Sequence, residues 1–159
     1  DTAIRQEAAA AAKAVPLVKL LEVPVTQAAA QVDVDVSQID FTQYAEVWIV
    51  PILSTPYNYI YLRCNNIATN SYFHSGTSQN CLCRLDGNGR LGQCKGKIRL
   101  AAYLSPIACI CENISNMPTQ PSYSTAPTIE PKDLQTLNFV ADGGTINGEG
   151  KIILWGWKL

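Results

Sequence analysis

Short runs in which apolar and polar residues alternate, each ended by turn-forming residues, recur through most of this 159-residue chain. The first clear run is 32–37, where valines alternate with aspartates and a serine. In a β-strand, successive side chains point to opposite faces, so alternation with a period of two residues predicts a strand with one buried face. The other strand candidates are residues 46–53, 57–64, 80–85, 94–104, 106–112, 134–140 and 150–157.

Turn chemistry separates these candidates, as at Asn65-Asn66 and in the glycine-containing segments 86–89 and 142–144. Many short strands with such turns and almost no helix are typical of an all-β fold. We therefore predict an antiparallel, jelly-roll-like β-sandwich over residues 31–159. The Ser-, Thr- and Pro-rich segment 113–133 is expected to be a long surface loop.

The first thirty residues have a different pattern. Residues 2–15 predict a short N-terminal α-helix, capped by Asp1 or Thr2 and ended by Pro16. Apolar side chains at alternating spacings of four and three form a stripe through which helices associate. The stripe consists of Ile4, Ala8, Ala11, Val15 and Val18. We therefore assign residues 1–30 to a helical stem and linker; the alternative is an Ala-rich helix packed on its own domain, or a frayed tail.

The six cysteines are Cys64, Cys81, Cys83, Cys94, Cys109 and Cys111. Two pairs are separated by a single residue, a spacing that puts both thiols on one face of a strand. We favour free thiols buried as small apolar side chains. Disulfides are the second possibility, and a zinc site is the third because structural zinc sites use wider cysteine spacings.

The hairpin around residues 86–89 shows the same logic in detail. On its second strand, Cys94 is expected on the buried face, with the basic residues Lys95, Lys97 and Arg99 facing water. On its first strand, Cys81, Cys83 and Leu85 are expected to be buried, with Leu82 and Arg84 facing outward.

Composition disfavours several functions. The net charge of −1 supplies no field for nucleic acid or an anionic membrane, and the alanine run near the N-terminus is too short to span a bilayer. The lone His74 has no nucleophile elbow or carboxylate pair beside it. The Gly-rich segment 87–90 precedes a predicted strand, whereas a phosphate-binding loop precedes a helix. We therefore expect a protein that is not an enzyme, with no catalytic residues, cofactor or metal.

Two features favour binding. Tyr57, Tyr59, Tyr61 and Arg63 alternate along one strand, and such an outward stripe can stack on sugar rings or form the centre of a protein interface. The alternative is that they pack under the loop 113–133 or against a sister subunit. Residues 47–111 also contain six basic side chains against one acidic one, which favours a negatively charged partner or, more simply, a solvated sheet face.

The two ends of the predicted sandwich carry a family resemblance. Residues 134–139 and 143–156, which include Lys151-Ile152-Ile153-Leu154-Trp155-Gly156, resemble the closing strands of bacteriophage tail-fibre and receptor-binding tip domains. Residues 36–44, with Ile39-Asp40 and Tyr44, resemble their opening strand. The resemblance implies a non-enzymatic homotrimer of the virion, at the distal end of the phage tail, that attaches to a polysaccharide or protein of the bacterial surface and contacts other tail proteins.

Three hypotheses follow. The first is this receptor-binding or tail-fibre domain, with a saccharide as the expected receptor. The second is a structural virion component, such as a baseplate, collar or head-decoration protein, which uses the sandwich for assembly and binds no host ligand. The third is a secreted carbohydrate-binding or depolymerising module, which needs bridged cysteines or a pair of carboxylates at catalytic spacing.

Overall fold

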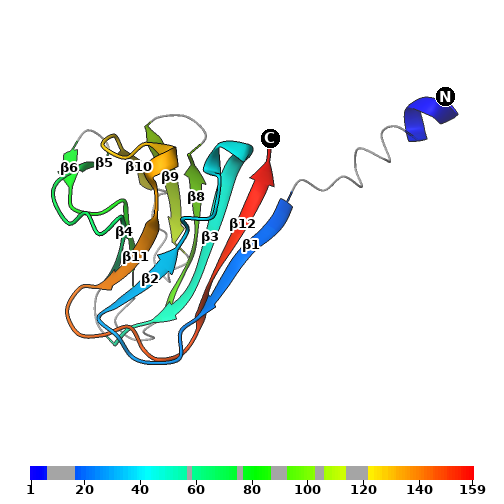
Figure 1. The fold of residues 1–159 in the computed structure, drawn as a ribbon. Coiled ribbons are helices and arrows are strands. Elements are labelled where there is room, and N and C mark those ends of the chain that lie inside the picture. The colour runs from blue at the N-terminus through cyan, green and yellow to red at the C-terminus, as the bar shows by residue number, and fades with distance from the viewer. Residues whose placement is uncertain (7–16, 57–58, 75–76, 87–92, 103–105, 114–121) are drawn as a thin grey trace.

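Two antiparallel sheets pack face to face around one apolar core (Figure 1). The computed structural model describes residues 1–6, 17–56, 59–74, 77–86, 93–102, 106–113 and 122–159. A short helical turn at residues 2–6 precedes the sheets, and the Asp1 carboxylate accepts a hydrogen bond from the Ala3 N–H, 2.9 Å away. The prediction of an antiparallel β-sandwich after a short N-terminal helix is confirmed.

The larger sheet has the order β1 (Leu17–Pro24), β12 (Lys151–Lys158), β3 (Tyr44–Ser54), β8 (Gln93–Ala101), β9 (Ile107–Asn113), β10 (Ser122–Ala126), β5 (Tyr72–His74) and β6 (Thr77–Gln79). The smaller sheet has the order β2 (Gln31–Asp35), β11 (Thr136–Ala141), β4 (Tyr59–Cys64) and β7 (Cys83–Asp86). Two 3₁₀ turns, η1 (Phe41–Gln43) and η2 (Pro131–Asp133), lie between strands.

The core forms because alternate side chains of both sheets point into the space between them. In β3, Val47 and Ile49 are buried while Trp48 between them is half-buried. The same alternation holds in the smaller sheet, where Leu62 and Phe139 are fully buried and lie opposite each other in the register. Burial of one face of each sheet therefore leaves the other face of each sheet on the surface.

Residues 17–24 are a strand, which corrects their assignment to the helical stem and linker. They form β1, whose residue Val18 pairs with Gly156 of β12, so Val18 belongs to the sandwich and not to a helical stripe. A register shift between Lys19 and Leu21 breaks the alternation, and this bulge hides the strand in the sequence. Of the other predicted stripe positions, Ile4 is 66% exposed in the N-terminal turn, while Ala8, Ala11 and Val15 lie outside the described residues.

Three further strands were not predicted, because they are short or lie in polar sequence. β5 and β6 have three residues each, too few for a period to be recognised. β10 lies within segment 113–133, so the prediction of one long loop is wrong for residues 122–126. β10 pairs with both β9 and β5 and so joins the small hairpin β5–β6 to the larger sheet.

Leu82 is buried, which corrects the prediction that it faces outward with Arg84. Period two applies only from Cys83, where β7 begins, and Leu82 lies in a bend just before it. Cys83 and Leu85 point inward and Arg84 points outward, as predicted. On β8, Ile98 and Leu100 are likewise buried, whereas the side chains of Cys94 and Lys95 lie outside the described part of the chain.

Gly150 provides a test of the close packing at the start of β12. Its φ is +98°, and a Cβ atom there would lie 2.1 Å from the Ile52 carbonyl oxygen of β3. Gly150→Ala is therefore expected to lower the free energy of unfolding by about 3 kcal/mol or more, because the backbone must shift as well as adopt an unfavourable conformation. Gly143→Ala is the matched control, since Gly143 also has positive φ but nothing within 4 Å of its added Cβ.

The control is expected to lose only about 1 kcal/mol, the cost of the left-handed conformation alone. Urea titrations of both variants and the native chain measure these differences. Equal losses in the two variants would show that the approach of Ile52 to Gly150 does not limit stability.

Candidate functional site

The outer surface of the smaller sheet brings together three of the four residues predicted to bind a ligand. Tyr59, Tyr61 and Arg63 share the outer face of β4, while the alternate residues of that strand are buried. Arg84 of β7 lies directly across from Tyr61 in the register. We call Tyr59, Tyr61, Arg63 and Arg84 the Tyr–Arg face. Tyr57, the fourth predicted residue, lies outside the described residues.

Each arginine of the Tyr–Arg face lies against a tyrosine ring. The Arg84 guanidinium carbon is 4.1 Å from the centroid of the Tyr59 ring, and the corresponding distance from Arg63 to Tyr61 is 5.7 Å. The Arg63 Nε also donates to the Asn80 carbonyl oxygen over 3.0 Å. Stacking of this kind restricts the guanidinium groups and leaves their planar set of N–H donors in a fixed orientation.

A carboxylate at the end of the neighbouring strand β11 completes this arrangement. The Tyr61 hydroxyl is hydrogen-bonded to Asp142, and the Asp142 backbone N–H donates to the Tyr59 carbonyl oxygen over 2.8 Å. Partial burial and then the hydrogen bond to Asp142 raise the pKa of Tyr61 above its ordinary value. Tyr61 therefore stays protonated and donates to the carboxylate throughout the neutral range.

Beside Arg63, a network of amides and one carboxylate extends across the same sheet face. Asn138 donates to Asp33 over 2.7 Å and accepts from the Asn66 N–H over 2.8 Å. Gln31 donates to both Asp33 and Asn66, at 2.6 and 2.7 Å. Asn138 is fully buried under these groups, so the network is rigid at its base while Asp33 and Gln31 are exposed above it.

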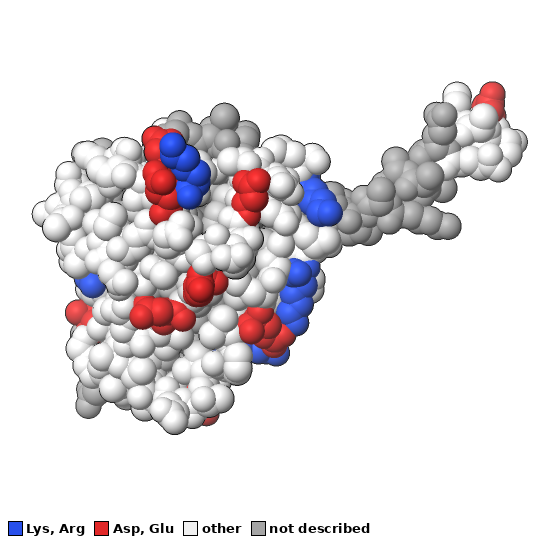
Figure 2. All heavy atoms as spheres, viewed as in Figure 1, with Lys and Arg blue, Asp and Glu red and all other residues white. Residues whose placement is uncertain are grey.

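The local excess of basic residues in the sequence does not form one basic surface. Arg63 and Arg84 lie on the outer face of the smaller sheet, where Asp33 and Asp142 are hydrogen-bonded to Asn138 and Tyr61. Lys97 and Arg99 lie on β8, on the opposite outer face, and each is paired with a glutamate. Charged side chains accordingly occur in small groups of both signs on the face shown in Figure 2.

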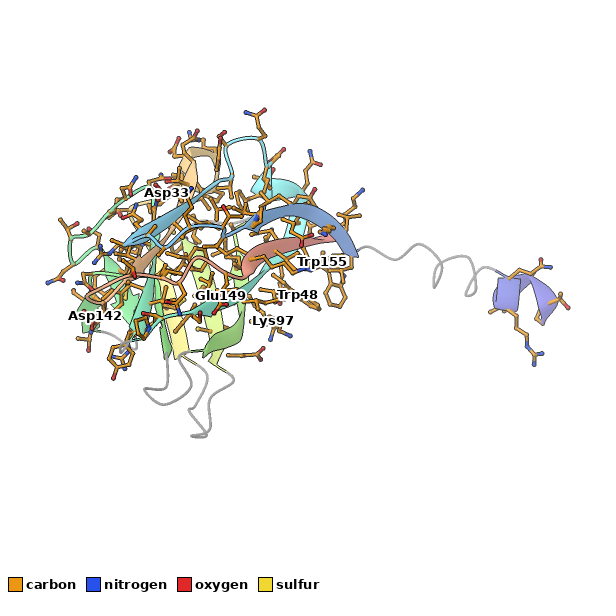
Figure 3. All side chains as sticks on the ribbon, turned by 90° about the horizontal axis from the view of Figure 1, so that it is seen from below. Asp33, Trp48, Lys97, Asp142, Glu149 and Trp155 are labelled. Carbon is orange, nitrogen blue, oxygen red and sulfur yellow. The ribbon has the colours of Figure 1, made fainter. Side chains whose placement is uncertain are left out.

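The outer face of the larger sheet carries all three tryptophans of the chain, which the sequence analysis did not identify as a group. Trp48 of β3 is paired in the register with Trp155 of β12, and the rings of Trp48 and Trp157 meet edge to face with centroids 5.4 Å apart. Ile52 and Trp157 are 38% and 43% exposed. We call Trp48, Trp155, Trp157, Val50, Ile52 and Ile153 the Trp face; Figure 3 shows Trp48 and Trp155 together, away from Asp33 and Asp142.

Polar groups hold Trp48 in place within the Trp face. Its indole N–H donates to the Glu46 carboxylate over 2.7 Å, and the Lys97 ammonium lies 4.6 Å from its ring centroid. Arg99 donates to both carboxylate oxygens of Glu46, at 2.6 and 3.0 Å. The hydrogen bond from Arg99 is the largest cause that lowers the pKa of Glu46, so this carboxylate is ionised at neutral pH.

An open cleft of about 480 Å³ lies between β1 and η1. Its acidic residues are already engaged in local turns, since Asp35 accepts from the Ser37 N–H and Asp40 accepts from the Thr42 N–H. Hydrogen bonds from the Ser37 and Thr42 side chains, and then those from their backbone N–H groups, lower the pKa of both carboxylates. The cleft therefore presents two anionic groups whose hydrogen-bonding capacity is partly used.

His74 contacts the backbone, and the described cysteines are buried in the core. A ring nitrogen of His74 lies 2.8 Å from the Cys81 carbonyl oxygen, a structural contact at the end of β5. The five cysteines with described side chains are buried free thiols, and burial raises the pKa of Cys81 to about 11. In the part of the chain that the structure describes, no group of three or more His, Cys, Asp or Glu residues is placed to hold a metal ion.

The two faces differ in how far sequence reasoning could find them. The Tyr–Arg face follows from alternation along one strand, but Arg84, Asp33 and Asp142 join it from other strands. The Trp face had a signal in the sequence, since Trp155 and Trp157 are two residues apart in the last strand and must share a face. Their pairing with Trp48 depends on the β12–β3 register, which the sequence does not specify.

Glu46 gives the Trp face a pH dependence with a defined sign. Since its folded pKa is below the ordinary 4.5, its ionised form contributes stability above that value, and this contribution is lost as the pH falls through the folded pKa. Glu46→Gln is expected to lower the free energy of unfolding by about 1 kcal/mol at pH 7, allowing for solvent screening. Denaturation from pH 7 to pH 3 should show the two proteins converging below about pH 4; a constant difference would exclude a charged role for Glu46.

Comparison with known proteins gives no assignment: no family model, no curated protein and no solved structure matches the chain. Among the described residues, no helix has the length and apolar character that a membrane crossing requires.

Proposed function

We propose that this chain is a non-enzymatic attachment domain of a bacteriophage tail fibre or receptor-binding protein, which associates as a homotrimer and binds a saccharide of the bacterial surface. The observation that supports saccharide binding is the juxtaposition of the Tyr–Arg face with the network of Asn138, Asp33 and Gln31. A saccharide presents many hydroxyl groups that both donate and accept hydrogen bonds. Carboxylates, amides and planar guanidinium groups fixed on a rigid sheet match this chemistry.

The mixed charge of the site favours a saccharide over a strongly anionic polymer. The face carries the guanidinium groups of Arg63 and Arg84 and the carboxylates of Asp33 and Asp142, so it offers donors and acceptors without a large net charge. The ring of Tyr59 is already covered on one side by Arg84, at 4.1 Å. Recognition is therefore expected to depend on hydrogen bonds from the guanidinium groups more than on stacking against open rings.

A shallow exposed face of this kind binds each saccharide weakly, and repetition compensates for weak sites. Three copies on one axis, and several assemblies on one virion, raise the effective concentration of sites and make attachment firm. The Trp face supports such assembly, because Ile52 and Trp157 expose apolar surface while most charges around them are paired within the chain. We propose that it packs against neighbouring copies.

The resemblance of residues 36–44, 134–139 and 143–156 to phage tip domains agrees with this proposal. The same Trp face also suits a structural virion component that assembles and binds no host ligand, which is the second candidate. The two differ in one respect: only an attachment domain needs the Tyr–Arg face to bind a saccharide.

The binding role of the Tyr–Arg face is tested by the double variant Arg63→Ala/Arg84→Ala. Removal of both guanidinium groups is expected to weaken binding to the responsive members of a panel of immobilised bacterial surface polysaccharides by at least about tenfold. Arg84→Lys, which keeps the charge but loses the planar donors that stack on Tyr59, should lose a large part of the affinity as well. Surface plasmon resonance measures all these affinities.

Lys19→Ala/Lys151→Ala is the matched control, since it removes two positive charges from the larger sheet. This control should bind as the native chain does. Equal losses in the two double variants would indicate a non-specific charge effect. No binding of the native, assembled protein to any polysaccharide in the panel or to whole host cells would favour the structural virion component.

Assembly through the Trp face is tested by Ile52→Ser/Trp157→Ser. Both side chains are exposed at the surface of β3 and β12, so the fold should persist while the apolar contact between copies is lost. Analytical ultracentrifugation is expected to show a trimer for the native chain and a monomer for the variant. Phe73→Ser is the control, because Phe73 is similarly exposed, at 41%, on the small hairpin β5–β6. If the Phe73 variant were a monomer and the double variant still a trimer, the assignment of the Trp face as the assembly surface would be contradicted.

A further inference from the structure

Three buried thiols face one another between the two sheets. Cys83 belongs to β7 of the smaller sheet, whereas Cys109 and Cys111 belong to β9 of the larger sheet. The backbones of β7 and β9 approach to within 8 Å, closer than the usual separation of about 10 Å between packed sheets. All three side chains are at most 3% exposed. Their position between the sheets is therefore one where a covalent bond would join the two layers.

A chain of hydrogen bonds orders these thiols. Cys83 is hydrogen-bonded to both Cys109 and Cys111, and the Cys109 Sγ lies 3.2 Å from the Ser124 Oγ. Ser124 in turn donates to the Leu82 carbonyl oxygen. The hydrogen bond between Cys83 and Cys109 raises the pKa of Cys83 and lowers that of Cys109. Cys111 is oriented differently, since its thiol points toward the Arg84 carbonyl oxygen at 3.9 Å.

We propose that Cys83 and Cys109 are a cross-linking site, at which a small-molecule disulfide such as oxidised glutathione converts the two thiols into a disulfide that joins the sheets. This inference depends on the core alone and is independent of the proposed attachment function. Both Cys109 and Cys111 are hydrogen-bonded to Cys83, and Cys109 is the assigned partner because Ser124 also holds its thiol, at 3.2 Å, whereas the Cys111 thiol is shared with the Arg84 carbonyl oxygen.

The chemistry balances as two thiol–disulfide exchanges. The Cys109 thiolate attacks one sulfur of the small disulfide, which forms a mixed disulfide and releases one small thiolate. Cys83 then loses its proton to water and attacks the Cys109 sulfur, which releases the second small thiolate. Two protein thiols are oxidised by two electrons, one small disulfide is reduced to two small thiols, and the two protons go to the released thiolates.

Burial decides when this reaction takes place. Cys83 and Cys109 are closed to a bulky reagent in the folded chain, so the exchange requires the sandwich to be open, as it is before folding is complete. Once the sheets close, the same burial shields the disulfide from thiols in solution. The bond closes a loop from residue 83 to residue 109, which restricts the unfolded chain and so stabilises the fold.

The experiment refolds the full chain from denaturant in the presence of oxidised glutathione, and in parallel under a reductant. The oxidised product is expected to lose the mass of two hydrogen atoms and to melt roughly 10 °C higher than the reduced product. Its disulfide should resist a reductant added to the folded protein and break when the reductant is added in denaturant. Refolding without any loss of mass would overturn the proposal.

Single alanine variants identify the bond, because proteolysis at lysine and arginine leaves Cys109 and Cys111 in one peptide. Cys83→Ala and Cys109→Ala are expected to abolish the mass loss, whereas Cys64→Ala, Cys81→Ala and Cys111→Ala should keep it. Circular dichroism of each reduced variant verifies that it folds, so that a missing bond is not mistaken for a missing fold. A mass loss retained in Cys83→Ala or in Cys109→Ala would overturn the assignment of this pair.

Discussion

The burial of one face of each sheet against the other is the constraint from which the rest of the molecule follows. Side chains in a strand alternate with a period of two, so each inward residue, such as Ile49 or Phe139, fixes its neighbours on the outside. The Trp face and the Tyr–Arg face are formed by the side chains that this alternation directs outward, away from the core. They lie on opposite sides of one core and can therefore serve different contacts without competing for space.

The alternation is also why so much of the fold can be predicted from sequence. Eight of the strands lie in segments whose alternation is regular enough to be recognised, and residues such as Asn65 and Asn66, both with positive φ, mark the turn after β4. The burial of Cys64, Cys83, Cys109 and Cys111, which lie in strands, follows from the same pattern. Leu82 shows the limit of this pattern, because it lies one residue before β7 begins, and the alternation does not apply there.

Other features depend on interactions that a single strand does not carry. β1 contains a bulge, and the short hairpin β5–β6 joins the larger sheet only through the pairing of β5 with β10, which is distant in sequence. The candidate site combines residues from β2, β4, β7 and β11, and only the register brings Arg84 opposite Tyr61 and Asp33 opposite Asn138. Sequence reasoning therefore identified the aromatic stripe and missed the carboxylates and amides that give it a hydrogen-bonding character.

The pairing of β1 with β12 determines how the sandwich responds to mechanical force. β1 is an edge strand, and it runs antiparallel to β12 from Leu17, opposite Trp157, to Pro24, opposite Lys151. Tension applied at residue 17 along the strand axis loads the hydrogen bonds of this pair together, in shear. Tension that separates residue 17 from the C-terminal end of β12 instead opens them one after another. The domain is thus expected to be mechanically strong along β1 and weak across it.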